Sequence, residues 1–581
     1  MWNKKRDKIF LFYIEFGNGV SPFRQTKSIQ IGILSIGTYL KEKGYNVQTF
    51  FDCYPDTDEL KRLISWERVR VIGFYTTMDN ICRVQALTDF IKENFPKIIV
   101  IFGGPLATIR PALLLEEGRA DIVVRYEGEY TMEELMDYYY HDKGSLEDIK
   151  GITYRDGNEI KHNPDRPFIE DLDELPILDR DLVPFKEDYP ILLTGRGCPY
   201  NCTFCFQGTG HYYRMRSVEN IMKEVDGLLE RYADPVYISF DDDVFITDRD
   251  RALALCRELK KRKELRPGFH WFSETRANIL YKYPELIKEM KEAGIAVLQF
   301  GTESANKKML EAYNKMITTE QVEFTVKKCV EEDIFQIATT FMLGGPFESR
   351  ETVEENINFA KKLIRMAPGR IRIVDGFLIP LPGTPIGDHP EKYGIILLKP
   401  YWKTGNSGGS ECISETVNLK RGELLELKKV FDRELMITME QELMNIPRKQ
   451  VEAIFSMLTE GIQALWYDLL SSNTALKRYF NFKDHGIYKT FHELKDFDAY
   501  FPQRTDFSYE LSEDRITLDR FGRKYLLNPF ESRILILSAG RIRFREMVSI
   551  LKEEFPESST QKILDFYRKM DDIYGIVFAK V

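Results

Sequence analysis

The stretch Cys198-Pro199-Tyr200-Asn201-Cys202-Thr203-Phe204-Cys205 places three thiols within eight residues. Three residues separate the first two cysteines, and two residues separate the second pair. This spacing lets one loop surround a single metal centre, and cysteine thiolates are the ligands of iron–sulfur clusters. Because this loop would give a four-iron cluster only three protein ligands, one iron would stay open to bind another ligand. The spacing therefore predicts a reactive [4Fe-4S] cluster held by Cys198, Cys202 and Cys205.

Two other interpretations of this cysteine group stay open. A structural zinc site has four protein ligands, and His211, six residues after Cys205, is a candidate for the fourth. Cysteines that only pack in a core rarely lie so close together. The remaining five cysteines are widely spaced and form no disulfide framework, which predicts a reducing compartment, the cytoplasm. They are Cys53, Cys82, Cys256, Cys329 and Cys412.

The Cys-x-x-x-Cys-x-aromatic-Cys motif resembles the signature of the radical S-adenosylmethionine (SAM) enzymes. In that family the open iron chelates the amino and carboxylate groups of SAM. One electron from the cluster then cleaves SAM to methionine and a 5′-deoxyadenosyl radical. The resemblance implies that Phe204 lies against the adenine of SAM. It also implies an electron donor of the flavodoxin or ferredoxin type.

Strand-like and helix-like runs alternate over residues 1–150, which predicts an α/β domain with a doubly wound, flavodoxin-like sheet. The strands are expected at 9–14, 46–52, 69–75, 98–103 and 121–126, with helices such as 33–43, 81–94 and 130–140. Such sheets bind ligands outside the carboxyl ends of their strands. Paired glycines let a backbone approach a flat ligand closely, although they could equally serve only to turn the chain. The predicted binding residues at these ends are Thr76, Thr77, Gly103, Gly104, Thr108, Glu127 and Gly128.

Together with the cysteine loop, this first domain resembles the cobalamin-binding domain of cobalamin-dependent radical SAM enzymes. In that family Gly-Gly-Pro and Gly-Glu recur in such loops, as in Gly103-Gly104-Pro105 and Gly128-Glu129 here. The Asp-x-His-x-x-Gly signature of other cobalamin proteins is missing, and the first histidine of the chain is His141. The resemblance therefore implies cobalamin without a histidine ligand from this domain. The alternative is a similar sheet that has lost its cofactor.

Residues 151–188 form a linker, with an Asp156-Gly157 hairpin turn and no expected chemistry. Strand and helix then alternate through residues 189–395, which predicts a partial (β/α)6 barrel with its chemistry at the C-terminal ends of the strands. The strands are expected at 191–194, 236–241, 270–273, 297–301, 337–343 and 373–379, and helices include 218–232, 284–293, 320–332 and 351–364.

Polar residues follow several of these barrel strands, although such residues often only cap the next helix. By resemblance to the radical SAM family, Glu303 matches the carboxylate that holds the ribose of SAM. Ser273 matches a polar position near the methionyl group. Asp242 occupies the place of the second-strand motif, but Asp241-Asp242-Asp243 departs from the usual Gly-Gly-Glu, so its contacts stay open.

Residues 396–500 are expected to be mainly helical, after a flexible loop at 405–410. Residues 501–581 combine short strands with three helices, which predicts a winged-helix domain. The strand pair that ends at Tyr525–Pro529 resembles the PqqD-like element that holds leader peptides of ribosomally made, modified peptides (RiPPs). A structural or dimerising cap is the alternative. Winged helices that bind DNA have a basic face, whereas acidic and basic residues alternate in the last helices here.

The net charge of −9 gives no reason to expect nucleic acid as a partner. No apolar run approaches the ~20 residues that a membrane helix needs. Its resemblance to the cobalamin-dependent radical SAM enzymes implies that the chain is a cytoplasmic enzyme of that kind. Its expected reaction is methylation of an unactivated carbon in a peptide or small molecule. A rearrangement or ring formation with the same cofactors, and a non-catalytic cluster-bearing binding protein, are the alternatives.

Overall fold

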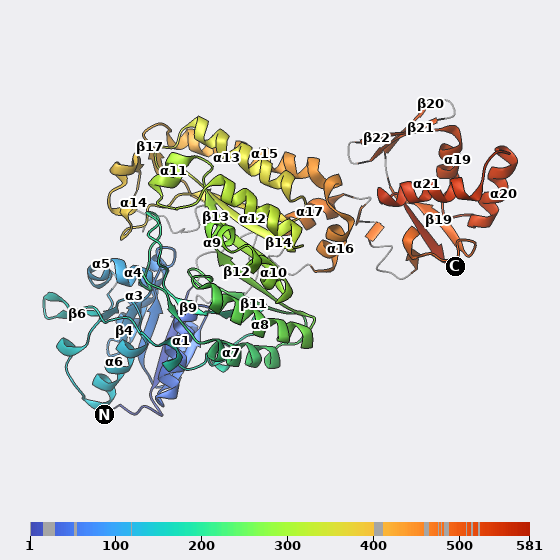
Figure 1. Cartoon of the computed structure of the whole chain (residues 1–581). Helices are drawn as coiled ribbons and strands as arrows, with labels where there is room; N and C mark the ends of the chain where they lie inside the picture. Colours follow the sequence, from blue (N-terminus) through green and yellow to red (C-terminus); the bar gives the residue numbers. More distant parts are fainter. Residues whose placement is uncertain are drawn as a thin grey trace. The chain divides into compact units, whose positions relative to one another are not determined.

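The computed structural model describes residues 2–14, 29–51, 55–117, 119–399, 411–457, 464–473, 476–477, 479–480, 487–506, 508–512, 515–520 and 523–580. The chain forms two compact units, Met1–Met436 and Ile437–Val581, and Figure 1 shows the elements of each. The predicted loop at 405–410 lies outside the described residues. No helix in the described part of the chain is long and apolar enough to cross a bilayer.

The first unit begins with a seven-stranded sheet in the order β2-β1-β3-β4-β5-β6-β7. Its first five strands are parallel and follow the flavodoxin order, as predicted. The hairpin β6–β7 adds to β5 in the antiparallel sense, so the first part of the predicted linker belongs to this sheet. The strands are β1 (Lys8–Tyr13), β2 (Asn46–Phe50), β3 (Val69–Tyr75), β4 (Ile99–Gly103), β5 (Ile122–Val124), β6 (Ile152–Asp156) and β7 (Glu159–His162).

Helices cover both faces of this sheet because its strands are apolar on both sides. In β1, Phe10 and Phe12 pack in one core with residues of α2, α3, α4 and α5. Ile9 and Leu11 point to the other face and pack with residues of α1 and α6. The helices are α1 (Ile31–Glu42), α2 (Thr57–Trp66), α3 (Ile81–Asn94), α4 (Pro105–Ile109), α5 (Pro111–Glu116) and α6 (Glu129–His141).

A six-stranded parallel sheet follows, in the order β15-β14-β13-β12-β11-β8. Each strand pairs with the next one along the chain, while β8 and β15 stay at the two edges within the described residues. This is the predicted partial (β/α)6 barrel. Its strands are β8 (Ile191–Leu192), β11 (Val236–Phe240), β12 (Phe269–Thr275), β13 (Ile295–Glu303), β14 (Gln336–Leu343) and β15 (Ile371–Phe377).

Helices separate the barrel strands, and most of them begin at a polar side-chain cap. The Ser217 hydroxyl accepts from the Asn220 amide at the start of α7, and Thr318 and Gln321 form a capping box at α12. The helices are α7 (Val218–Arg231), α8 (Arg249–Leu265), α9 (Ala277–Lys282), α10 (Glu285–Glu292), α11 (Lys307–Ala312), α12 (Thr319–Glu331) and α13 (Arg350–Met366). The short α14 (Pro385–Asp388), the hairpin β16 (Ile395–Leu397) and β17 (Ser414–Thr416), and α15 (Arg421–Glu442) come next.

The second unit contains two small antiparallel sheets, and the helices at 529–537, 544–554 and 560–572 pack with them on one shared core. The predicted boundary at residue 501 falls inside β19, which pairs with the last strand β23. One sheet holds β18 (Tyr488–Lys489), β23 (Ile576–Lys580) and β19 (Tyr500–Arg504), and the other holds β20 (Ser508–Ser512), β21 (Arg515–Arg520) and β22 (Arg523–Leu527). The helices are α16 (Arg448–Ser456), α17 (Ala464–Ser472), α19 (Pro529–Leu537), α20 (Phe544–Glu554) and α21 (Thr560–Asp572).

Candidate functional site

The three cysteines lie on the loop between the short strands β9 (Gly195–Arg196) and β10 (Arg214–Met215), which pair with each other. Cys202 is buried, Cys198 is half-buried and Cys205 is exposed. The Cys198 amide donates to the Gly210 carbonyl (3.2 Å), and the Cys205 amide donates to the Cys202 carbonyl (3.1 Å). The first bond joins the start of the loop to its end and the second forms a turn within it, so the three cysteines lie on one compact loop.

Two aspartates that follow β11 fix the base of this cysteine loop. The buried Asp242 carboxylate accepts from the amides of Thr194 (2.8 Å) and Gly195 (2.7 Å). Asp243 accepts from the Gly197 amide (3.0 Å) and the Thr209 hydroxyl (2.6 Å). Both oxygens of Asp242 have protein partners, so Asp242 holds the base of the loop in place.

The surroundings of the cysteines suit a cluster better than a single ion. Arg276 donates to the Cys202 sulfur at 3.6 Å, so a positively charged side chain lies against one of the candidate cluster ligands. His211 pairs with the Asn201 side chain (2.9 Å). In the described part of the chain no three His, Cys, Asp or Glu side chains converge on a point that would hold one metal ion. A four-iron cluster is larger than one ion, so its three thiols need not meet at one point.

Phe204 and Glu303 are connected through Lys315 on the barrel side of the loop. The Lys315 ammonium lies 2.7 Å from a Glu303 oxygen and 5.7 Å from the centre of the Phe204 ring. The Phe204 ring also meets Tyr313 edge-on at 5.2 Å. Glu303 is buried, accepts from the Thr340 hydroxyl (2.8 Å) and has a φ of 64°. Backbone strain at a non-glycine residue is common at ligand sites, which fits the expected SAM pocket.

Ser273 and Glu274 point to opposite faces of β12, because side chains alternate along a strand. Ser273 is fully buried on the face that carries Trp271, and its hydroxyl has no hydrogen-bond partner among the described residues. Glu274 lies on the other face and accepts a hydrogen bond from Gln299 of β13. Burial, together with the carboxylates of Asp241 and Glu303, raises the pKa of Glu274 to about 7. Ser273 stays a predicted SAM contact, and Glu274 is a second candidate on the opposite face of the strand.

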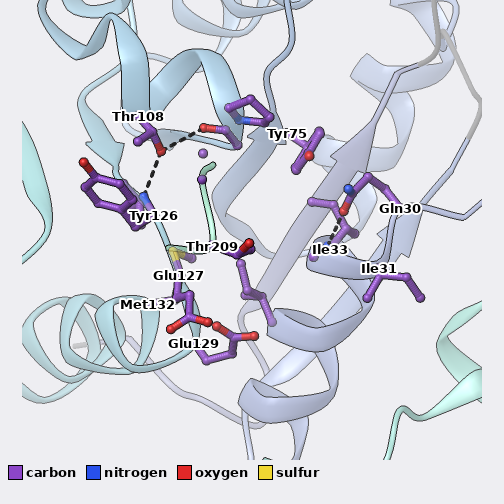
Figure 2. Close-up of a pocket in the computed structure, with 18 of the residues that line it drawn as sticks. Gln30, Ile31, Ile33, Tyr75, Thr108, Tyr126, Glu127, Glu129, Met132 and Thr209 are labelled. Carbon is purple, nitrogen blue, oxygen red and sulfur yellow. Dashed lines mark hydrogen bonds between the residues drawn. The ribbon is translucent and has the colours of Figure 1, made fainter. Parts of the chain in front are cut away.

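A cavity of about 370 Å³ opens at the carboxyl ends of β1, β3, β4 and β5 (Figure 2). Its volume is within the usual range of small-molecule sites. Five of the predicted residues line it, namely Gly103, Gly104, Thr108, Glu127 and Gly128. Its wall also includes residues of the cysteine loop and its flanks, namely Arg196, Phe206, Gly208, Thr209 and Asp243. The first domain and the cysteine loop therefore enclose one shared space.

Thr76 and Thr77 do not line this cavity. The Thr76 hydroxyl donates to the Gly103 carbonyl (2.8 Å), and the Thr77 amide donates to the Asn80 side chain (2.8 Å). Both threonines therefore shape the turn after β3. Their role as ligand contacts stays a prediction.

The two cavity glycines are there for different reasons. Gly104 has a φ of 96°, and a Cβ at that position would lie 2.9 Å from the Thr76 carbonyl oxygen. The fold itself therefore requires glycine at 104. A Cβ on Gly103 would meet only the Val124 carbonyl oxygen, at 4.0 Å. None of the described residues fills the space beside Gly103, which is what a flat ligand on this backbone needs.

Hydrogen bonds to backbone groups hold the Thr108 hydroxyl in place at the rim of the cavity. The Thr108 hydroxyl accepts from the Tyr126 amide (2.8 Å) and donates to the Gly104 carbonyl (3.3 Å), as Figure 2 shows. Burial raises the pKa of the nearby Tyr75 phenol to about 12. No histidine is among the described residues that line the cavity. The prediction of cobalamin without a histidine ligand is consistent with this lining.

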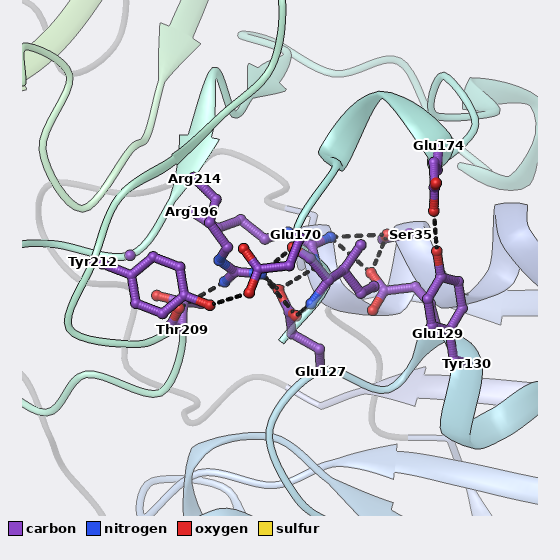
Figure 3. A network of polar contacts seen from close by, with 12 residues as sticks. Ser35, Glu127, Glu129, Tyr130, Glu170, Glu174, Arg196, Thr209, Tyr212 and Arg214 are labelled. Atoms are coloured by element: carbon purple, nitrogen blue, oxygen red, sulfur yellow. Dashed lines mark hydrogen bonds and ion pairs between the residues drawn. The ribbon is translucent and has the colours of Figure 1, made fainter. Parts of the chain in front are cut away.

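A buried ion network joins the cavity to the cysteine loop (Figure 3), and it was not predicted from the sequence. Glu127 and Glu129 from the first domain bind Arg196 and Arg214 from β9 and β10. Burial alone would raise the pKa of Glu129, but Arg196 and the Ser35 hydroxyl lower it below its usual value. The sequence pointed to Glu127 and Glu129 as members of a strand-end loop, but it gave no sign that Arg196 and Arg214 are their partners.

Comparison with known proteins assigns families to both parts of this site. Residues 24–136 match the B12 binding domain, and residues 192–360 match the radical SAM superfamily. An uncharacterized methyltransferase of Pyrococcus horikoshii is 33% identical over 302 residues, which cover 50% of this chain and 64% of that protein. The anaerobic magnesium-protoporphyrin IX monomethyl ester cyclase of Cereibacter sphaeroides is 27% identical over 338 residues, 55% of this chain and 54% of the cyclase. The chain thus spans less than two thirds of either relative.

Among solved structures, the cobalamin-dependent SAM radical enzyme OxsB, with aqua-cobalamin and SAM bound, has the same fold. Its TM-score is 0.60 at 15% identity, over 98% of this chain and 84% of OxsB. The radical SAM domain implies a [4Fe-4S] cluster and SAM, and the B12 binding domain implies cobalamin. The cysteine loop and the cavity with its open Gly103 fit these groups.

Proposed function

The chain combines the B12 binding and radical SAM domains of cobalamin-dependent radical SAM proteins, and we propose that it is an enzyme that methylates an unactivated carbon. The observation that carries this proposal is the shared cavity. Its walls come from the strand ends of the first domain and from the cysteine loop itself. A cofactor held there lies directly beside the loop where SAM would be cleaved.

The bound cofactors would supply a 5′-deoxyadenosyl radical from SAM and a methyl group from cobalamin. The residues of the chain hold and orient them. Cys198, Cys202 and Cys205 would bind the cluster, with Arg276 beside the Cys202 sulfur. Phe204 and Glu303 would contact the adenine and ribose of SAM. Gly103 would leave room for the corrin ring.

A labelled methyl group tests this reaction without knowledge of the substrate. Protein reconstituted with iron, sulfide and hydroxocobalamin would be incubated anaerobically with a low-potential reductant and SAM carrying a deuterated methyl group. Mass spectrometry should find the deuterated methyl on the protein-bound cobalamin, together with 5′-deoxyadenosine. Formation of 5′-deoxyadenosine with no labelled cobalamin would favour a rearrangement or ring formation, which is the activity named for the cyclase relative. Absence of both products would favour a non-catalytic binding protein.

We also propose that the second unit selects a peptide substrate. Support comes from β20, whose five residues are all exposed and which pairs only with β21 in the described part of the chain. Tyr509 and Leu511 are 51% and 68% exposed, although their cross-strand partners Leu518 and Ile516 are buried. An extended peptide can add to such an edge through backbone hydrogen bonds while its side chains use the apolar positions. A small-molecule substrate and a structural role for this unit are the alternatives.

A charge on the β20 edge tests the peptide proposal in the full-length chain. Leu511→Asp should weaken turnover of a full-length precursor peptide and leave cobalamin binding and iron content unchanged. Leu526→Asp is the matched control, because Leu526 is 61% exposed on β22 and pairs with Thr517 on the opposite face. Equal turnover by the two variants would argue against peptide selection at this edge.

A cluster with an open iron also needs a reducing environment and a source of single electrons. We therefore place the protein in the cytoplasm with an electron donor of the flavodoxin or ferredoxin type. Reduction of the reconstituted cluster by purified flavodoxin, followed by its EPR signal, tests this partner.

A further inference from the structure

Four buried charged side chains connect the first domain to the strands that carry the cysteine loop. Arg196 lies 2.9 Å from Glu127 and 2.7 Å from Glu129, and Arg214 lies 2.9 Å from Glu127. None of these side chains is more than 13% exposed. Two carboxylates face two guanidinium groups, so the charges balance. We call these four residues the carboxylate–arginine network (Figure 3).

On one side, the network forms part of the cavity wall. Glu127, Glu129 and Arg196 all line the cavity. Both Glu127 oxygens are used, since one accepts from Arg196 and Arg214 and the other accepts from Arg214 and the Ile169 amide. The Ser35 hydroxyl of α1 donates to Glu129 (2.6 Å). Protein groups therefore occupy both oxygens of the Glu127 carboxylate, and the two arginines fix the position of this part of the cavity wall.

On the other side, the same arginines hold both ends of the cysteine loop. Arg196 lies in β9, two residues before Cys198. Arg214 lies in the paired strand β10 and donates to the Thr209 carbonyl (2.7 Å) near the end of the loop. The Thr209 hydroxyl is bound by Asp243, which also accepts from the Gly197 amide. A shift of either arginine therefore moves the base of the loop and the wall of the cavity together.

We propose that Arg196 and Arg214 are positioning residues that couple the two cofactor sites, so that binding of the cluster strengthens binding of cobalamin. This inference rests on the cofactors that the two domains imply, and does not depend on the reaction proposed above. A cluster fixes the cysteine loop and with it Arg196, so the cavity wall is already ordered when cobalamin arrives. Coupling of this kind is reciprocal, and cobalamin must strengthen cluster binding by the same factor.

Arg196→Lys is the variant that separates coupling from folding. Lysine keeps the charge, but its single ammonium cannot bridge two carboxylates as the planar guanidinium does. The buried charges therefore stay balanced while the bridge between Glu127 and Glu129 is lost. Arg249→Lys is the matched control, because Arg249 pairs with Glu285 on exposed surface far along the chain in α8.

The test measures the Kd of hydroxocobalamin for full-length protein with and without the reconstituted cluster. The wild-type protein and Arg249→Lys should bind at least about fivefold more tightly with the cluster, which is the lower end of typical coupling. Arg196→Lys should bind cobalamin with nearly the same Kd in both states, while its iron content matches the wild type. A wild-type ratio of one or below, or full coupling in Arg196→Lys, would overturn the proposal. Because the wild-type ratio alone can refute it, the test does not depend on whether the variant folds. Failure of methyl transfer would leave the measured coupling untouched.

Discussion

Alanine at position 103 should separate the role of the cavity backbone in ligand binding from its role in folding. Among the described residues, the heavy atom nearest to a methyl group on Gly103 would be the Val124 carbonyl oxygen, at 4.0 Å. We therefore expect Gly103→Ala to change the free energy of unfolding by no more than about 0.5 kcal/mol. The free space beside Gly103 is the cavity, so the added methyl meets the corrin ring if cobalamin lies there.

The expected loss of affinity follows from the cost of one extra methyl group in a filled site. Overpacking of this kind costs about 1–3 kcal/mol, which corresponds to a Kd about 5-fold to 150-fold weaker. Titration with hydroxocobalamin, followed by its absorbance, measures the Kd. Thermal unfolding of the ligand-free protein measures stability in parallel.

Two further glycines provide the comparison for this variant. Gly227→Ala, in α7 with nothing within 4 Å of the new Cβ, should leave the Kd unchanged. Gly104→Ala should lower stability itself, because its φ of 96° and the Thr76 carbonyl at 2.9 Å both exclude a side chain. A Gly103→Ala protein that binds cobalamin as tightly as the wild type would refute the placement of the corrin ring against this backbone.

Three other outcomes follow from the site. Replacing all three loop cysteines by alanine should remove the about four irons of the reconstituted cluster, as measured by iron analysis, and SAM cleavage that survives this change would contradict the cluster assignment. The EPR spectrum of bound Co(II) cobalamin should lack nitrogen superhyperfine splitting, since no histidine lines the cavity in the described residues, and a split signal would contradict the placement. Because burial and neighbouring carboxylates raise the pKa of Glu274 from 4.5 to about 7, the folded state holds a proton that the unfolded state releases. Stability of the ligand-free protein should therefore fall as pH rises from about 4.5 to about 7. Glu274→Gln should flatten that slope in pH-dependent unfolding experiments, and an unchanged slope would show that Glu274 titrates normally.

Many helices and strands of this chain could be predicted from its sequence, because each contains a long run of regularly spaced apolar residues. The predicted helix at 81–94 coincides with α3, and the predicted strand at 69–75 coincides with β3. The hairpin β6–β7 was recognised through its Asp156-Gly157 turn, but not as part of the first sheet. The hairpin joins the sheet through backbone pairing with β5, where Val124 is opposite Ile152. The pattern of side chains along a sequence does not show which strands pair through their backbones.

The site was less predictable than the elements, because it depends on where individual side chains point. Sequence reasoning found the strand-end loops and named Ser273 as a SAM contact, but not Glu274, which lies on the opposite face of β12. A change of one residue along a strand reverses the face, and both faces of β12 are largely covered. Asp242 was placed at the right strand end, but its carboxylate binds the Thr194 and Gly195 amides, which are distant in sequence.

The carboxylate–arginine network shows why the two domains meet through charges. Removing four charges from water is costly, and a buried ion pair often adds little net stability compared with apolar packing. Apolar side chains could therefore hold the domains together equally well, but they slide and repack at small cost. A guanidinium that bridges Glu127 and Glu129 fixes both direction and distance. Reactive groups on two cofactors must be positioned with a precision of about 0.5 Å, so at this interface a rigid bridge serves the chemistry better than a more stable contact would.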